Sequence, residues 1–251
     1  MENLPTGQAG KKSKYLKYAI GEIALVVIGI LIALQINTWN ENRKIKRENY
    51  FLSKRLLNEV NKNIVSFDVS FTSLEKINTS TIQTLSLITE DYKTANATLI
   101  DSLIYNILIT PRNHFFTAVL DEALSTGKIS LFKNDTLKQI IYTIPTSINE
   151  IKEEEKGIDI DINEKMVPFL YENISLRAVD SKFSEFGKKI GRSNLKPSDN
   201  RVILKNRKFE NILDNKYYLT QRLLSRYNLL QKDFVKLQHL LLDNLKHGTI
   251  F

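Results

Sequence analysis

A stretch of 19 residues, YAIGEIALVVIGILIALQI at positions 18–36, decides how this chain is organised. Its central run, positions 23–34, contains no polar side chain. An α-helix rises about 1.5 Å per residue, so this stretch would be roughly 28 Å long, close to the roughly 30 Å of a bilayer's hydrocarbon core. The stretch therefore predicts a helix that crosses a membrane.

Aromatic and basic residues flank the stretch. Trp39 follows it closely, and an amphipathic ring of this kind prefers the headgroup level of a membrane. Basic residues stand beyond both ends: Lys11, Lys12, Lys14, Lys17, Arg43, Lys44, Lys46 and Arg47. We therefore divide the chain into a basic tail (1–14), a transmembrane anchor (15–39) and a helical bundle domain (40–251), and we expect the lipid bilayer as a partner.

The charge distribution favours a membrane surface over nucleic acid as that partner. Of the formal net charge of +8, the first 47 residues carry +5, and this excess flanks the apolar stretch. The 251 residues include no cysteine, 42% are hydrophobic and 25% are charged. This composition excludes a disulfide framework and a disordered tail, and it is sufficient for a hydrophobic core.

Two other interpretations of the apolar stretch remain open. It would also suit the core helix of a soluble protein, or a cleaved signal peptide, although no small-x-small pattern stands where the run ends at Ala33-Leu34-Gln35. Four basic residues precede the stretch and four follow it, so their count gives no orientation. Glu41 and Glu48 dilute only the later cluster. We therefore expect an inner-membrane protein whose tail is cytoplasmic and whose C-terminal domain is periplasmic.

Two apolar stripes at helical spacing predict two long helices. The first stripe contains Leu52, Leu56, Val60, Ile64, Phe67, Phe71, Leu74 and Ile77. We interpret it as one helix, continuous with the anchor and frayed or bent near residue 79, where four polar residues interrupt the stripe. The second stripe predicts a helix over residues 209–246, and it contains Phe209, Leu213, Leu223, Tyr227, Leu230, Phe234, Leu237, Leu241 and Leu245. The two helices need each other's apolar faces.

Prolines and glycines divide the middle of the chain into shorter pieces. Helices are expected at about 98–109, 114–125, 134–155 and 164–176, whereas residues 177–208, with a net charge of +7, are expected to form a loop. Evidence for strands is thin. The predicted fold is mostly α, with a single N-terminal transmembrane helix that continues into a long juxtamembrane helix and an antiparallel helical bundle.

Residues 15–44, YLKYAIGEIALVVIGILIALQINTWNENRK, closely resemble the opening signature of a family of single-pass membrane proteins. The family is bacterial, mostly from the Bacteroidetes, and is catalogued as a domain of unknown function. A Gly-Glu entry and an Ala-Leu-Gln-Ile-Asn exit make the match specific. The stretch ALSTGKI at 123–129, with KNDTL at 133–137, is similar to a weaker motif of the family. The resemblance implies a helical membrane protein and supplies no activity.

No constellation of side chains indicates a reaction, a metal or a cofactor. Asp159, Asp161 and Asn163 have the spacing that opens a calcium loop, but Glu164 stands where the loop needs glycine and Leu170 where it needs glutamate. Three histidines and no cysteine are available for a zinc site. The motifs of a phosphate loop and of a nucleophile elbow are absent. We therefore expect a protein that is not an enzyme and that uses no cofactor.

The apolar stretch carries the strongest indication of a binding site. At 100° per residue, Glu22, Gly29, Ala33 and Asn37 share one face, which lipid would not favour. Gly29 and Ala33 form a small-x-x-x-small pair that allows a second helix to approach closely. In the alternative interpretation, Glu22 only reaches the headgroups.

These features favour a scaffold or protein-interaction module that self-associates or binds another membrane protein. A ligand-binding sensory helical bundle is the alternative function. No feature favours nucleic acid as a partner.

Overall fold

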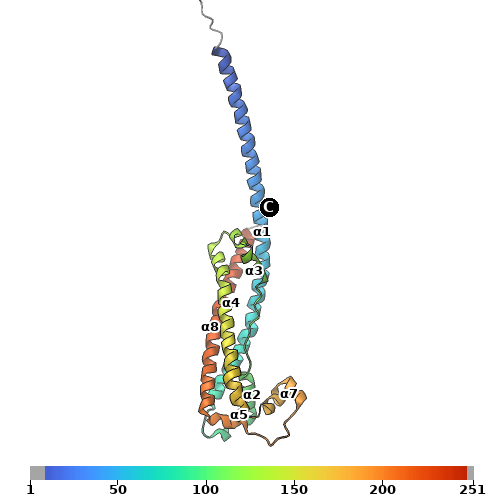
Figure 1. The fold of residues 1–251 in the computed structure, drawn as a ribbon, viewed down its shortest axis with the longest axis vertical. Coiled ribbons are helices and arrows are strands. Elements are labelled where there is room, and N and C mark those ends of the chain that lie inside the picture. The colour runs from blue at the N-terminus through green and yellow to red at the C-terminus, as the bar shows by residue number, and fades with distance from the viewer. Residues whose placement is uncertain (1–8, 248–251) are drawn as a thin grey trace, which may run out of the picture.

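The computed structural model describes the backbone of residues 9–247 and the side chains of residues 18–246. Within these ranges it contains eight α-helices and no β-strand (Figure 1). The prediction of a mostly helical fold is confirmed. One helix extends far beyond the others, and the remaining elements form an elongated body at one of its ends.

The extended helix is α1, Ala9–Ser86, which is 78 residues long. It runs from the apolar stretch into the body and past residue 79 without a break, so the predicted fraying near residue 79 is wrong. Three of the four polar residues at this point, Asn78, Ser80 and Thr81, are buried, and their side chains have partners. Thr81 and Thr84 donate to the carbonyl oxygens of Ile77 and Ser80, at 2.8 and 2.7 Å. The helix therefore continues where its apolar stripe is interrupted.

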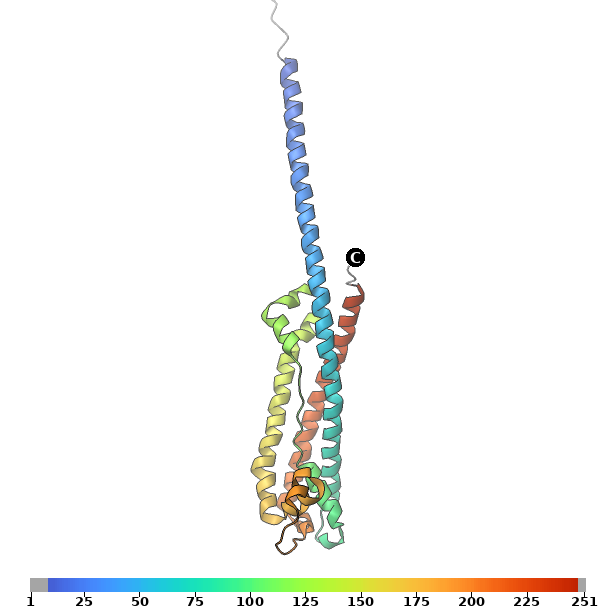
Figure 2. The ribbon, with the colours of Figure 1, turned by 90° about the vertical axis from the view of Figure 1, so that its right-hand side faces the viewer.

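Four rods that alternate in direction build the body (Figure 2). α1 runs away from the apolar stretch, and α2, Ala97–Ile107, turns back toward it. Residues 109–117 continue this second rod as extended chain and lead to α3, Ala118–Ser125, and a 3₁₀ turn, Lys128–Leu131. The third rod is α4, Asp135–Asp161, and the fourth is α8, Arg207–His247.

α1 and α8 form the largest contact of the body, as their stripes predict. Phe67 of α1 is fully buried, and its ring centroid lies 5.7 Å from that of Tyr227 and 6.0 Å from that of Phe234 on α8. Hydrogen bonds join the two helices in opposite chain order, from Asn244 to Asn49, from Gln238 to Asn61 and from Thr220 to Asn78. Aromatic pairs of this kind add to the free energy gained from burying apolar surface.

The extended segment 109–117 replaces part of a helix in the second rod, so the predicted helix 114–125 begins only at Ala118. Extended backbone in a core needs hydrogen-bond partners. Asn63 of α1 donates to the Phe116 carbonyl at 2.8 Å and accepts from the Phe116 amide at 2.9 Å. Glu155 of α4 accepts from the Asn113 amide at 2.9 Å. Side chains therefore make the hydrogen bonds to this backbone that a neighbouring strand would make in a sheet.

Residues 177–208 are not the loop that the sequence predicts. They contain most of α6, Leu176–Phe183, then α7, Glu185–Ile190, and a 3₁₀ turn, Asn200–Lys205. Each begins at a residue whose side-chain oxygen accepts a backbone N–H of the first turn, namely Ser175, Ser184 and Asp199. Such caps stabilise short helices that lack a long apolar stripe.

The end of α4 also departs from expectation. The helix continues to Asp161, past the predicted end at residue 155, and is followed by a π-helical turn, Ile162–Met166, and by α5, Val167–Asn173. π-Helical turns insert an extra residue into a helix and often occur where side chains have a special role. Next to this turn, two charged groups lie close together, one fully buried and the other partly buried.

These groups are Lys216 of α8 and Asp161 of α4. Lys216 is fully buried, and its Nζ atom has no hydrogen-bond partner within the described residues. Asp161 accepts one hydrogen bond, from Asn215 at 2.9 Å, and its other carboxylate oxygen has none there. Burial lowers the pKa of Lys216 from 10.5 to about 8, although the negative charges of Asp161 and Asp159 oppose this shift. Burial likewise raises the pKa of the Asp161 carboxyl.

We predict that Lys216→Met raises the thermal unfolding midpoint at pH 7. Because the pKa of Lys216 is lowered from 10.5 to about 8, the lysine is charged in the folded protein below pH 8, and keeping this charge buried lowers the free energy of unfolding by up to roughly 3 kcal/mol. Between about pH 8 and 10.5 the unfolded chain binds more protons at this lysine than the folded protein, so the wild-type free energy of unfolding should rise with pH.

The variant should lose that rise, and calorimetry of the detergent-solubilised protein at pH 7 and pH 10 measures both effects. Lys236→Met is the matched control, because Lys236 is an exposed lysine of the same helix. A lower midpoint for Lys216→Met at pH 7, with the control unchanged, would show instead that the pair with Asp161 stabilises the fold.

Candidate functional site

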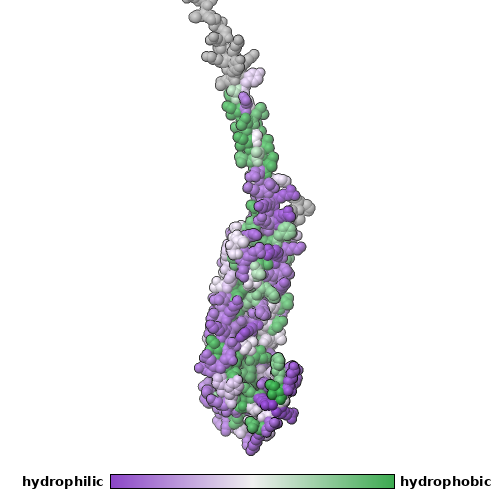
Figure 3. Space-filling model, turned by 45° about the vertical axis from the view of Figure 1, so that its right-hand side comes forward, coloured by the Kyte–Doolittle hydropathy of each residue, from purple (hydrophilic) through white to green (hydrophobic). Residues whose placement is uncertain are grey.

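The apolar stretch of α1 stands clear of the body (Figure 3). None of it is buried against the rest of the chain, as the core helix of a soluble protein would be. By length and composition, this helix is the one among the described residues that is able to cross a membrane. The structure therefore gives no support to the core-helix interpretation.

The predicted packing residues Glu22, Gly29, Ala33 and Asn37 are all exposed on this part of α1. A side chain added at Gly29 would meet no atom within 4 Å. Asn37 makes a local contact, because its Nδ2 atom donates to Glu41 Oε1 at 3.3 Å. The shared face is accessible on a single copy of the chain, and its packing against a second helix stays a prediction.

The predicted membrane-flanking residues divide into two groups. The side chains of Lys11, Lys12, Lys14 and Lys17 lie outside the described residues. Trp39, Arg43 and Lys44 are exposed, and the Arg43 guanidinium lies 5.6 Å from the centroid of the Trp39 ring. A cation over an indole face in this position suits the polar edge of a bilayer.

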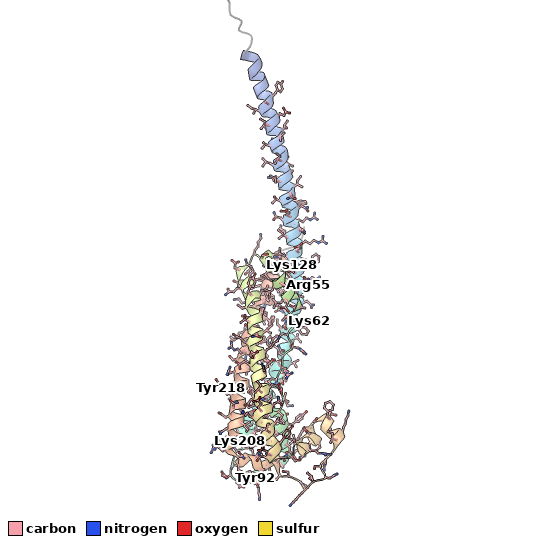
Figure 4. The ribbon with its side chains drawn as sticks, viewed as in Figure 1. Arg55, Lys62, Tyr92, Lys128, Lys208 and Tyr218 are labelled. Carbon is pink, nitrogen blue, oxygen red and sulfur yellow. The ribbon has the colours of Figure 1, made fainter. Side chains whose placement is uncertain are left out.

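A groove opens where α1 enters the body, and we call it the collar groove. It has a volume of about 400 Å³ and lies between α1 and the segment formed by α3 and the following 3₁₀ turn. Figure 4 labels Arg55 and Lys128 from its two sides. The lining residues are Lys44, Arg47, Glu48, Phe51, Leu52, Arg55, Glu122 and Lys128.

Hydrogen bonds from α1 hold the other side of the groove in place. Asn49 donates to the Leu131 carbonyl at 2.7 Å, and Arg55 binds both carboxylate oxygens of Glu122, at 3.0 and 2.5 Å. This bond keeps the pKa of the Glu122 carboxyl below its usual range. A bidentate pair of this kind fixes both position and orientation.

Glu59 fixes the start of α3. Its buried carboxylate accepts from the amides of Val119 and Leu120 at 2.7 and 2.9 Å, where the N-terminus of a helix favours negative charge. Burial raises the pKa of the Glu59 carboxyl, and the two amide hydrogen bonds oppose that shift. The groove is therefore built on buried polar contacts.

Two cations of the collar groove, Lys44 and Arg47, form no ion pair within the described part of the chain, whereas Arg55 is paired with Glu122. Arg47 lies 5.8 Å from the centroid of the half-exposed Phe51 ring. Side chains of a helix tilt toward its N-terminus, which in α1 is the side of the apolar stretch. The groove thus presents positive charge and an aromatic surface beside that stretch, and we propose that the positive charge attracts an anionic lipid headgroup.

The sequence predicted one side of this site and missed the other. Lys44 and Arg47 were evident as a basic flank. Glu122 and Lys128 were not, because only the fold brings them to α1. The signal that was available is the motif ALSTGKI at 123–129, which begins beside Glu122 and includes Lys128.

Residues 22–157 match the model of a family of unknown function, DUF6090, over more than half of the chain. The chain belongs to this family. The DUF6090 match takes in α2, α3, the rest of α1 from Glu22 and most of α4, and it therefore contains the whole collar groove. Neither a curated protein nor a solved structure matches the chain.

We predict that Lys44→Gln/Arg47→Gln reduces retention of anionic lipid by about thirtyfold, because each of the two basic residues near a charged membrane surface contributes about 1 kcal/mol. The full chain would be reconstituted in phosphatidylglycerol and phosphatidylcholine, and native mass spectrometry would count the lipids that remain bound. Lys54→Gln/Lys76→Gln is the control, because it removes the same charge from exposed positions farther along α1. Equal losses in the two variants would assign the effect to net charge.

Proposed function

We propose that this DUF6090 protein is an inner-membrane scaffold or interaction module that self-associates, and not an enzyme. The observation that carries the proposal is the continuity of α1. The same 78-residue helix contains the apolar stretch and provides the rod against which α8, α2 and α3 pack. In this proposal it is a single membrane span that continues directly into an antiparallel helical bundle.

The rigidity of α1 links association in the membrane to the position of the bundle. Hydrogen bonds to the rest of the body begin at Asn49, twelve residues after Asn37. At about 1.5 Å per residue, roughly 18 Å of helix separates the predicted packing face from the body. A continuous helix bends only gently over such a distance. Two spans in contact would therefore hold their two bundles side by side.

The polar face of the span supports a second helix as the partner. Glu22, Gly29, Ala33 and Asn37 follow one another at intervals of seven, four and four residues. A carboxyl and an amide in a membrane gain from contact with protein, and the small residues allow close approach. The second helix belongs to another copy of the chain or to a different membrane protein.

A ligand-binding sensory bundle is the second candidate function. It is favoured by a hollow of about 650 Å³ at the end of the body opposite the apolar stretch, between α2, α6 and residues 192–200. Sites for small molecules commonly have volumes of about 300–1,000 Å³.

We predict that Gly29→Leu weakens association of the span about fivefold, whereas Val27→Leu has little effect. A leucine at Gly29 would push the partner backbone away, while Val27 lies on another face and should contact lipid. The fivefold effect corresponds to about 1 kcal/mol, which is typical for one helix contact in a membrane. A bacterial two-hybrid assay for membrane spans measures both. Equal signals from the two variants and the wild type would mean that the polar face is incidental.

We predict that the C-terminal domain lies outside the cytoplasm. The lysines before the span have no acidic neighbours, whereas Glu41 and Glu48 accompany those after it. Alkaline phosphatase, which is active only after export, should be active when fused after Phe251. A cytoplasm-active reporter at the same position is the control, and activity of that reporter with a silent phosphatase would reverse the orientation.

A further inference from the structure

We propose that the hollow at the far end of the body is a binding site for a small organic anion that also carries a hydrogen-bond donor. α2, α6 and residues 192–200 line it. This site is independent of association in the membrane. It lies beyond the DUF6090 match except for its α2 wall.

A buried carboxylate organises the floor of the hollow. Asp101 of α2 is 4% exposed, although its neighbours on that face are apolar core residues. One of its oxygens accepts from Lys182 of α6 at 2.5 Å, and the other accepts from Asn200 at 2.8 Å. Asn200 is also buried and accepts from the Ser175 amide at 2.9 Å. A buried charge that is fully hydrogen bonded holds these three segments in fixed relation.

The loop over the hollow is attached at both ends. Arg177 of α6 donates to the carbonyl oxygens of Ile190 and Gly191, both at 3.1 Å, and Gly191 has the positive φ of 77° that favours glycine. At the other end, Asp199 binds Arg201, whose guanidinium also donates to the Ala95 carbonyl at 3.0 Å. The loop that forms the rim is therefore held in place at both ends, as expected for a binding site that is formed before the ligand arrives.

The charged side chains around the hollow that form no ion pair within the described residues indicate which ligand it would bind. Arg192 and Lys196 line the rim and form no ion pair within the described residues, whereas Lys182 and Asp199 are already paired. A guanidinium and an ammonium on one short loop suit a carboxylate or phosphate group. Glu172, also on the rim and unpaired within the same residues, suits a hydroxyl or ammonium donor on the same ligand.

Citrate, which has three carboxylates and a hydroxyl, is the probe. The full chain in detergent would be titrated by calorimetry at constant ionic strength, with chloride as the reference salt. We expect one saturable site. Arg192→Gln/Lys196→Gln should weaken binding at least tenfold, since both residues are exposed and their loss leaves the fold intact. Lys188→Gln/Lys189→Gln removes the same charge from α7, outside the hollow, and should change binding less than twofold.

Asp101→Asn tests the floor separately. The amide keeps the shape of the carboxyl and releases the Lys182 ammonium from its partner, so citrate should bind several-fold more tightly. The absence of a saturable site, equal losses in the two double variants, or weaker binding by a folded Asp101→Asn protein would each overturn the proposal. The thermal unfolding midpoint reports whether each variant is folded. None of these outcomes depends on whether the spans associate.

Discussion

The structure depends on one constraint, which is that α1 stays a single helix in two different surroundings. Between Tyr18 and Trp39 its outer surface is exposed and largely apolar, and from Leu52 onward only one stripe is apolar and that stripe is buried. The backbone hydrogen bonds are satisfied within the helix in either surrounding, which is why a helix suits both. Everything else in the body is arranged around the buried half of this rod.

The second rod shows how the body accommodates a segment that is not helical. Residues 109–117 pass between α1 and α4 as extended chain, and asparagine, serine and glutamate side chains bind their polar groups. The tyrosine hydroxyl of Tyr227 completes this network by donating to Glu155 at 2.5 Å. Burial raises the pKa of the Glu155 carboxyl, so its charge depends on these bonds. A polar network thus stabilises a place where helix packing is lost.

The sequence predicted the long helices, which have a repeating apolar pattern. It did not predict the short capped helices or the contacts between residues that are far apart in the chain. The stripes from Leu52 and from Phe209 predicted α1 and α8, because burial of one helical face leaves a repeating pattern. The helices after Ser175 and Ser184 were missed, since a cap is a single residue and their apolar pattern is short. The collar groove was half predicted, because the pair Arg55–Glu122 joins residues that are far apart in the chain. The hollow around Asp101 was missed for the same reason.

The pairing of α1 with α8 also affects how the chain is made. The apolar stripe of α1 is synthesised before its main partner, because α8 follows all the other helices of the described residues. Contacts between distant segments form late in folding, and an uncovered apolar face is open to wrong contacts until then. Completion of the body therefore waits until α8 has been synthesised, and a chain that stops before residue 207 would present the α1 stripe without its cover.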